Sequence, residues 1–256
     1  MSKLTLTQLI GIPLIHPGDD LNGILNEALL ENKIQLLDGD VLVIAQKIIS
    51  KAENRLVNLS QITPSVEAHA ISRKCGKRAE LVELILQESK EIIRIRPGTI
   101  VVEHRLGFVC ANAGIDHSNV VGPDGEPIDW VLMLPTDPDS SAGSISTYFK
   151  EKRDIDIGVL IVDSHGRAWR NGSIGMTIGL ANVPAVIDMR GEKDIYGYTL
   201  KATQMAVADE LAACATMMMG EADERIPAIH VRGFPHPLRK GDLSELIRKK
   251  EFDMFR

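Results

Sequence analysis

The chain has 256 residues, of which 44% are hydrophobic and 25% charged, and this balance excludes disordered, collagen-like and fibrous proteins. Its 29 basic and 35 acidic side chains give a formal net charge of -6, so the overall charge favours neither nucleic acid nor an anionic membrane as a partner. The three cysteines are scattered, and there is neither a signal-peptide pattern nor an apolar run near the ~18 residues of a membrane span. We therefore expect a cytoplasmic protein without disulfides, a thiolate zinc site or a membrane anchor.

The first half of the chain predicts a strand, two helices and a strand meander. The β-branched run at 41–45 is typical of a central strand that is covered on both faces. Thr63, followed by a proline, is expected to cap a helix that extends to about residue 74, and a second helix is expected over 79–90. Short β-rich segments then indicate three strands, over 92–95, 99–102 and 108–111.

The second half begins with a segment at 120–141 that is rich in proline, glycine and aspartate. This composition predicts a long loop, or a crossing between two subdomains of one domain that spans residues 1–256. A helix is expected from about Ser140 to 153, with Asp139 or Ser140 as its cap. The remaining predicted elements are strands at 157–162, 183–187 and 227–231, a helix at 199–219 that Gly220 closes, and a charged helix at 244–255.

Two aspartates placed just after apolar strands are the first candidates for chemistry. Asp116 ends the string Asn-Ala-Gly-Ile-Asp, and Asp163 follows the strand at 157–162. Such carboxylates suit a hard cation such as Mg²⁺ or Mn²⁺, which prefers oxygen ligands and keeps positions open for phosphate oxygens. The alternative is that each aspartate is a helix cap or a turn former. Because the sequence has neither the Walker A nor the Rossmann glycine pattern, a nucleotide would need another cradle.

Basic side chains follow the same predicted strands. Lys51 lies a few residues after the strand at 41–45 and can place an ammonium group on a phosphate. Arg167 and Arg170 lie beyond the strand at 157–162, and a guanidinium group matches a phosphate or a carboxylate. The alternative for this segment is a surface turn with solvated arginines, in which His165 is an ordinary loop residue.

Five short strings occur in a recognisable order: Ile12-Pro13-Leu14-Ile15, Gly39-Asp40-Val41-Leu42-Val43, Ile49-Ser50-Lys51-Ala52-Glu53, Asn112-Ala113-Gly114-Ile115-Asp116 and Asp163-Ser164-His165-Gly166-Arg167. Each string is unspecific by itself, but five in order are specific. The series resembles the coenzyme F-420:L-glutamate ligase family, the gamma-glutamyl ligases of deazaflavin coenzyme synthesis, from about residue 8 to 233. The resemblance implies an unusual α/β fold with mixed sheets, in which two intertwined parts form a homodimer with active sites near the protomer boundary.

The family's activity implies that the chain uses GTP to join L-glutamate to the precursor F-420-0 and then adds a further gamma-linked glutamate. The expected route is an acyl phosphate that the glutamate amine attacks, with Mg²⁺ or Mn²⁺ and with K⁺ as a further ion. Carried over by position, the resemblance implies metal contacts at Asp116, Asp163, Ser164 and Glu221. It implies nucleotide contacts at Ile12, Pro13, Leu14, Ile15, Gln46, Lys47, Lys51, Asn119, Met219, Gly220, Glu221, Ala222, Asp223, Glu224, Arg225 and Ile226.

The expected catalytic set combines the two aspartates with basic side chains, because phosphoryl transfer depends mainly on neutralising charge. We expect Arg167 or Arg170 to hold a carboxylate or phosphate of a substrate. The set is therefore Lys51, Asp116, Asp163 and Arg167.

The chain departs from its relatives at two positions of the last string. Ser164 keeps a hydroxyl where relatives often have threonine, whereas His165 replaces a common asparagine and its role stays open. Two other functions are compatible with the same residues, namely a metal-dependent phosphohydrolase and a non-catalytic dimer that binds nucleotide. In each case we expect small-molecule ligands rather than nucleic acid or a membrane.

Overall fold

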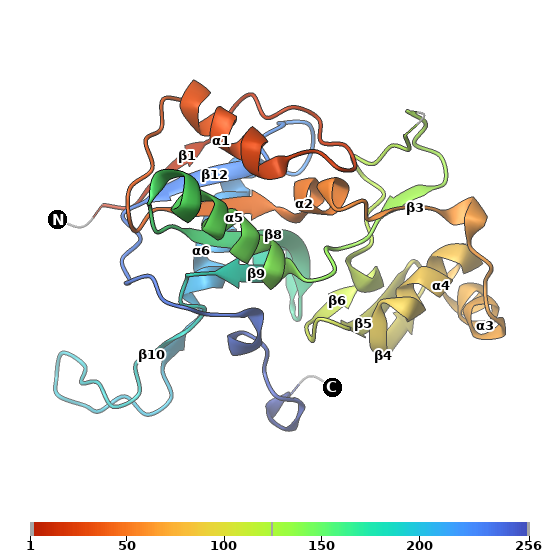
Figure 1. Cartoon of the computed structure of the whole chain (residues 1–256). Helices are drawn as coiled ribbons and strands as arrows, with labels where there is room; N and C mark the ends of the chain where they lie inside the picture. Colours follow the sequence, from red (N-terminus) through yellow and green to blue (C-terminus); the bar gives the residue numbers. More distant parts are fainter. Residues whose placement is uncertain (1–2, 124, 255–256) are drawn as a thin grey trace.

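The computed structural model describes residues 3–123 and 125–254, and its centre is a five-stranded mixed sheet (Figure 1). β2 and β8 are parallel, and the other neighbouring strands are antiparallel. The run at 41–45 forms the middle strand, which confirms its prediction. The strand order is β1 (Thr5–Gln8), β12 (Ala228–Arg232), β2 (Val41–Ala45), β8 (Gly158–Arg167) and β9 (Arg170–Ala181).

Helices cover both faces of this sheet, which explains why β2 is apolar at every position. Alternate side chains of a strand point to opposite faces. Leu42 and Ile44 join the apolar cluster under α1, α2 and α5, whereas Val41 and Val43 join the cluster under α6. The helices are α1 (Leu21–Glu31), α2 (Gln46–Ala52), α5 (Pro138–Arg153) and α6 (Val207–Met219).

A smaller unit lies beside the main sheet and contains the predicted strand meander (Figure 1). Its sheet packs against a pair of helices, and its apolar side chains continue the cluster on the α5 face of the main sheet. The predicted loop at 120–141 contains β7, which pairs with β3. The elements of this unit are β3 (Leu56–Asn58), η1 (Leu59–Gln61), α3 (Val66–Cys75), α4 (Ala79–Gln87), β4 (Ser89–Arg96), β5 (Thr99–His104), β6 (Val109–Ala111), η2 (Asn112–Gly114) and β7 (Trp130–Leu132).

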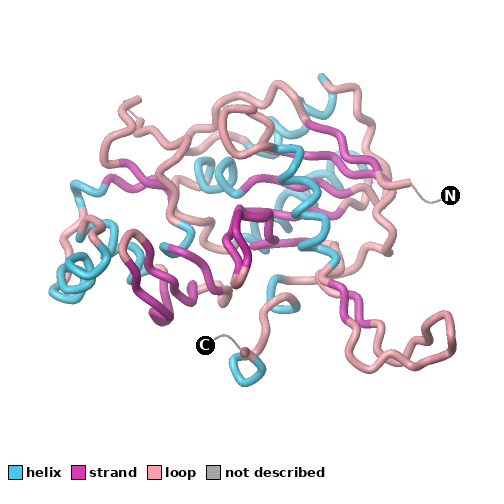
Figure 2. The backbone as a smooth tube through the Cα atoms, turned by 180° about the vertical axis from the view of Figure 1, so that it is seen from behind, coloured by secondary structure: helices cyan, strands magenta, loops and turns pink. Residues whose placement is uncertain are grey.

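An arm extends from the main body on the side away from the smaller unit (Figure 2). β10 (Ile187–Asp188) and β11 (Gln204–Met205) pair at its base, and most of the loop between them is exposed. Two 3-10 turns, η3 (Leu243–Glu245) and η4 (Lys250–Phe252), follow β12. In the described ranges, no helix has the length and apolar character needed to cross a membrane.

The caps of two helices differ from the prediction. Ser65, two residues after Thr63, caps α3, because its hydroxyl accepts an N–H of the first helical turn at 3.1 Å. Asp137 caps α5 in place of the predicted Asp139 or Ser140. The Asp139 carboxylate instead accepts backbone N–H groups on β9 and η3, so it joins α5 to both. The local sequence pattern does not show which of these neighbouring side-chain oxygens caps the helix and which one bonds a distant strand or turn.

The arm and the last segment also contradict their predictions. Of the strand predicted at 183–187, only the last residue lies in β10, and the helix predicted at 199–219 begins at Val207, because the preceding residues belong to the arm. The helix predicted at 244–255 is replaced by η3 and η4 as far as residue 254, and residue 255 lies outside the described residues.

β8 is longer than its apolar run predicts. It continues past Asp163 to Arg167 and turns directly into β9, which supplies a backbone partner for each of these residues. The predicted surface turn that begins at Asp163 is therefore the end of a β-hairpin. Asp163 lies inside a strand, where its backbone is fixed by the sheet.

A buried charge cluster joins the start of β2 to β12. The Asp40 side chain is 3% exposed and accepts hydrogen bonds from His230 Nε2 at 2.8 Å and from Arg232 Nη2 at 2.7 Å. Burial by itself would raise the pKa of this carboxyl group, but the hydrogen bonds from His230 and Arg232 outweigh burial and lower the pKa of Asp40 to about 2. The ionised form of Asp40 therefore stabilises the fold.

Asp40→Asn should lower the free energy of unfolding by about 2–3 kcal/mol near neutral pH, because His230 and Arg232 lose their charged partner. Since folding lowers the pKa of Asp40 from 3.8 to about 2, its contribution is complete above its unfolded-state pKa and is lost as the pH falls toward its folded-state pKa. Urea unfolding near neutral pH and near pH ~3 measures both effects. Exposed Glu27→Gln on α1 is the control, and equal stability of the Asp40 variant and the wild type near neutral pH would contradict the assignment.

Candidate functional site

The parallel pairing of β2 and β8 brings two segments of the predicted site together. The last residue of β2 pairs with Val162 of β8, and α2 begins at the next residue, Gln46. Because parallel strands run in the same direction, the residues that follow this pair lie at the same end of the sheet. The first turn of α2 therefore lies beside Asp163 and Ser164, and all of them line one pocket.

Asp116 reaches the same pocket from the smaller unit. After β6 the chain forms η2, in which three consecutive residues have left-handed φ angles of 52°, 53° and 64°. The third is Gly114, where a Cβ would lie 2.7 Å from the Leu134 side chain. The backbone N–H and C=O of Asp116 then pair with Leu132 of β7 at 2.9 Å each. This turn and this backbone pair fix the position of the Asp116 carboxylate.

The segment after α6 closes a third side of the pocket. Gly220 ends α6 with a φ of 78°, and a Cβ there would lie 2.1 Å from a neighbouring carboxyl group. The next residue, Glu221, accepts a hydrogen bond from the Ser164 hydroxyl at 2.5 Å. Asn119 Nδ2 donates to the Ala222 C=O at 3.0 Å, so the loop after Asp116 holds this segment in place.

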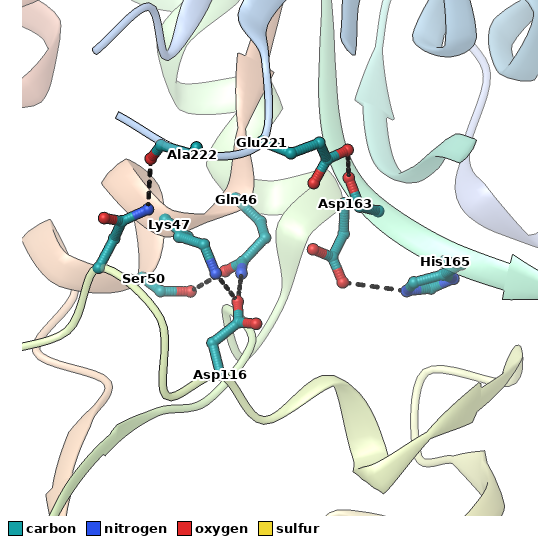
Figure 3. A network of polar contacts seen from close by, with 10 residues as sticks. Gln46, Lys47, Ser50, Asp116, Asp163, His165, Glu221 and Ala222 are labelled. Atoms are coloured by element: carbon teal, nitrogen blue, oxygen red, sulfur yellow. Dashed lines mark hydrogen bonds and ion pairs between the residues drawn. The ribbon is translucent and has the colours of Figure 1, made fainter. Parts of the chain in front are cut away.

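These segments enclose a pocket of about 240 Å³. Gln46 Nε2 donates to Asp116 Oδ2 at 2.7 Å, and the Lys47 ammonium pairs with the same oxygen (Figure 3). Ser50 Oγ donates to Gln46 Oε1 at 2.9 Å, which turns the amide so that its NH₂ group faces Asp116. The lining residues are Ala45, Gln46, Lys47, Asp116, Ser118, Val162, Asp163, Ser164, Ser173, Thr216, Met219 and Glu221.

The charged groups of the pocket shift one another's pKa values. Burial raises the pKa of Asp116, the Lys47 charge lowers it, and the Asp163 charge raises it further. Burial lowers the pKa of Lys51, one helical turn after Lys47, and the positive charge of Lys47 adds to this effect. The Asp116 and Asp163 carboxylates thus repel each other, and a cation between them would relieve that repulsion.

The oxygen donors around the pocket match the ligand preferences of a divalent cation. Asp116, Asp163 and Glu221 supply carboxylates and Ser164 supplies a hydroxyl, all of them hard ligands. Within residues 3–123 and 125–254, no three histidine, cysteine, aspartate or glutamate side chains already converge as a metal-binding group. Asp116 is paired with Lys47, and Glu221 with Ser164, so these side chains must turn toward a cation as it binds. The donor chemistry therefore fits Mg²⁺ or Mn²⁺ without a preformed cage.

The structure brings together seven of the site residues predicted from the resemblance, which line the pocket: Gln46, Lys47, Asp116, Asp163, Ser164, Met219 and Glu221. Two more, Asn119 and Ala222, are hydrogen-bonded to each other beside it. The other predicted residues do not line the pocket: Ile12, Pro13, Leu14, Ile15, Lys51, Arg167, Gly220, Asp223, Glu224, Arg225 and Ile226. Ile12 and Ile15 are buried in the apolar core, whereas Leu14 and the hairpin arginines Arg167 and Arg170 are exposed.

Sequence reasoning missed the role of His165. It is not a loop residue, because it lies within β8, is 5% exposed, and places Nε2 3.0 Å from Asp163 Oδ2 (Figure 3). The two-residue spacing of Asp163 and His165 could have predicted this contact. Residues i and i+2 of a strand share a face, so a strand extended beyond Val162 places His165 beside Asp163.

Known proteins are similar to this chain over nearly its whole length. The family model described as F420-0:Gamma-glutamyl ligase matches residues 9–233. A relative from Methanothermobacter thermautotrophicus named Coenzyme F420:L-glutamate ligase is 46% identical over 255 residues, which cover 99% of each chain. Relatives of the same name are 43% identical over 245 residues in Methanococcus maripaludis, with 96% of this chain and 94% of the relative covered, and 40% identical over 251 residues in Methanocaldococcus jannaschii, with 97% and 96% covered.

Proposed function

The chain belongs to the F420-0:gamma-glutamyl ligase family, and from this membership we propose that it joins L-glutamate to F-420-0 by an amide bond at the expense of GTP. The observation that carries the proposal is the convergence of Asp116, Asp163, Ser164 and Glu221, far apart in the chain, on one pocket that also holds Lys47. Addition of a further gamma-linked glutamate uses the same chemistry on the product of the first step.

The proposed reaction activates a carboxylate before the amide forms. A carboxylate oxygen of F-420-0 attacks the gamma phosphorus of GTP, and GDP leaves with the electron pair of the broken P–O bond. The glutamate amine then attacks the acyl carbon, inorganic phosphate leaves, and the nitrogen loses a proton. The products are the amide, GDP and phosphate, so both steps depend on neutralising phosphate charge.

The residues in and beside the pocket have different proposed roles in this reaction. Asp116, Asp163, Ser164 and Glu221 are the residues that would hold Mg²⁺ or Mn²⁺, and the ion would supply charge neutralisation on phosphate oxygens. Lys47 and the neighbouring Lys51 supply further positive charge from α2. Because the Lys47 and Asp116 side chains are only 28% and 26% exposed, their charges are screened less than fully exposed charges would be.

The nucleotide is proposed to lie along the segment at 219–226 and the loop at 12–15. Asn119 supports this placement, because its hydrogen bond holds the first segment beside the pocket. Gln8 Nε2 donates to the Met218 C=O at 2.8 Å, so the strand that leads to the loop at 12–15 lies beside the end of α6. The two segments therefore start from neighbouring positions.

The end of the β8–β9 hairpin is proposed to hold an acidic group of a substrate. β8 leads from Asp163 at the pocket to Arg167, which pairs with Arg170 across the turn. Both arginine side chains are exposed. Two guanidinium groups on paired strands of a hairpin can bind a carboxylate or phosphate through several hydrogen bonds.

A homodimer is also proposed, and the arm between β10 and β11 supports it. Ile195 is 90% exposed, Tyr196 89% and Tyr198 57%, on a segment that extends away from the body (Figure 2). Large apolar side chains gathered on one exposed segment are typical of an interaction surface. A second copy of the chain would remove them from water.

Incubation of the purified protein with F-420-0, GTP, Mn²⁺ and L-glutamate should yield a product heavier by one glutamyl unit, detected by mass spectrometry together with GDP. Asp116→Asn and Asp163→Asn should each lower the rate at least about 100-fold, because each removes a negative oxygen donor from the pocket. Exposed Glu27→Gln on α1 should retain the wild-type rate.

Two outcomes of this assay contradict the proposal. Release of phosphate from GTP with no glutamyl product would indicate the phosphohydrolase, and nucleotide binding without turnover would indicate the non-catalytic dimer.

Replacing Arg167 and Arg170 together by alanine should raise the KM for F-420-0 or L-glutamate at least about tenfold, because an acidic group loses its charged partners. The KM for GTP should stay within about twofold of wild type, since neither arginine lines the pocket. Steady-state kinetics of this variant and of exposed Arg73→Ala on α3 measure the effect. Unchanged KM values for both acidic substrates would refute this role.

Replacing Ile195 and Tyr196 together by serine should convert the dimer into a monomer, as measured by multi-angle light scattering. Because both side chains are almost fully exposed within one chain, each variant subunit should stay folded, and its thermal unfolding midpoint should fall only by the contribution of dimer formation. Ile128→Ser, at an exposed position in the smaller unit, is the matched control. A monomeric wild type, or a dimer that persists in the double variant, would rule out the arm as the interface.

A further inference from the structure

We propose that His165 is a positioning residue that orients the Asp163 carboxylate through a hydrogen bond, with its own ring held by Phe108 of the smaller unit. The inference rests on the function proposed above, in which both aspartates hold a divalent cation. His165 does not line the pocket, so it acts through Asp163.

His165 contacts Asp163 directly, at hydrogen-bond distance and largely shielded from solvent. His165 Nε2 lies 3.0 Å from Asp163 Oδ2, and the two side chains are 5% and 13% exposed. An ionised carboxylate can only accept a hydrogen bond, so Nε2 carries the hydrogen. Pairing of β8 with Met176 and Ile174 of β9 fixes the backbone of both residues. A carboxylate held in this way has fewer orientations to lose when it binds a ligand.

Phe108 of the smaller unit holds the ring of His165 in place. The ring centroids of Phe108 and His165 are 5.2 Å apart. Phe108 also stacks on His104, with a centroid distance of 5.2 Å and an interplanar angle of 5°. His104 is fully buried and lies 3.6 Å from Glu88, which is paired with two arginines. Because the same unit carries Asp116, this stack connects the supports of the two carboxylates.

The surroundings of Nδ1, the other ring nitrogen of His165, indicate that this side chain does more than fill space in the core. Nδ1 is buried and has no hydrogen-bond partner among residues 3–123 and 125–254. An unpartnered buried polar atom costs about 1–3 kcal/mol, and a phenylalanine at this position would avoid that cost. A histidine is therefore favoured over a phenylalanine at this position only if the hydrogen bond from its Nε2–H to Asp163 serves a function.

The test measures Mn²⁺ binding to the full-length chain without nucleotide or substrate, by electron paramagnetic resonance of the free ion. His165→Phe keeps a ring against Phe108 but removes the donor, and should weaken Mn²⁺ binding about 10–100-fold. His165→Gln, whose amide N–H can take the place of Nε2–H, should restore most of the affinity. Exposed His69→Leu on α3 is the control, and thermal unfolding reports whether each variant is folded. If His165→Phe does not fold, His165→Leu, which lacks both the ring and the donor, is compared with His165→Gln, which lacks only the ring.

A purely structural role would change the thermal midpoint but not the affinity for Mn²⁺. Wild-type affinity in a folded His165→Phe variant would therefore overturn this inference alone. A wild-type protein that binds no Mn²⁺ would overturn the metal assignment of Asp163 and the inference with it. If the wild type binds Mn²⁺, and the donor-free variant binds it more weakly, yet no glutamyl product forms, the proposed function fails while the role of His165 stands.

Discussion

The candidate site depends on the parallel pairing of β2 with β8. Both strands lie between two helical layers, and their apolar side chains are buried on both faces of the sheet. A slip by one residue would turn Asp163 to the opposite face of the sheet, away from its present neighbours. With the correct register, the first turn of α2 and the polar half of β8 meet at one end of the sheet. The packing of the core is thus also what assembles the pocket.

The pocket combines burial with opposing charges. Asp116 lies where burial and the charge of Asp163 both disfavour its ionised form, and Lys47 only partly offsets them. An additional positive charge bound at such a site stabilises its ionised carboxylates. The same surroundings suit phosphoryl transfer, in which fixed charges act on a substrate that has lost most of its water. Family membership and local electrostatics therefore point in the same direction.

The supports of the pocket lie mostly outside it. Gly114 and Gly220 have positive φ angles that favour glycine, and each turn leads to one acidic side chain of the pocket. The stack of His104, Phe108 and His165 connects the smaller unit to β8. These contacts connect the two units from which the pocket is assembled. They also give structural importance to residues that do not line the pocket.

The sequence by itself determined the features that depend on neighbouring residues. The apolar run at 41–45, the glycine that ends α6 and the meander of three strands are all local patterns, and the structure confirms them. The ordered series of strings was enough to establish the family, and it included Asp116 and Asp163, although residue patterns alone left both open as turn formers.

Only the tertiary structure decided which distant groups meet. The length of β8, the pair formed by Lys47 and Asp116, the contact of His165 with Asp163 and the arm between β10 and β11 all depend on such meetings. The physical reason is that a cap or an apolar run is stabilised within a few residues of the chain. A strand edge or a buried charge is stabilised by whichever partner the completed fold places beside it.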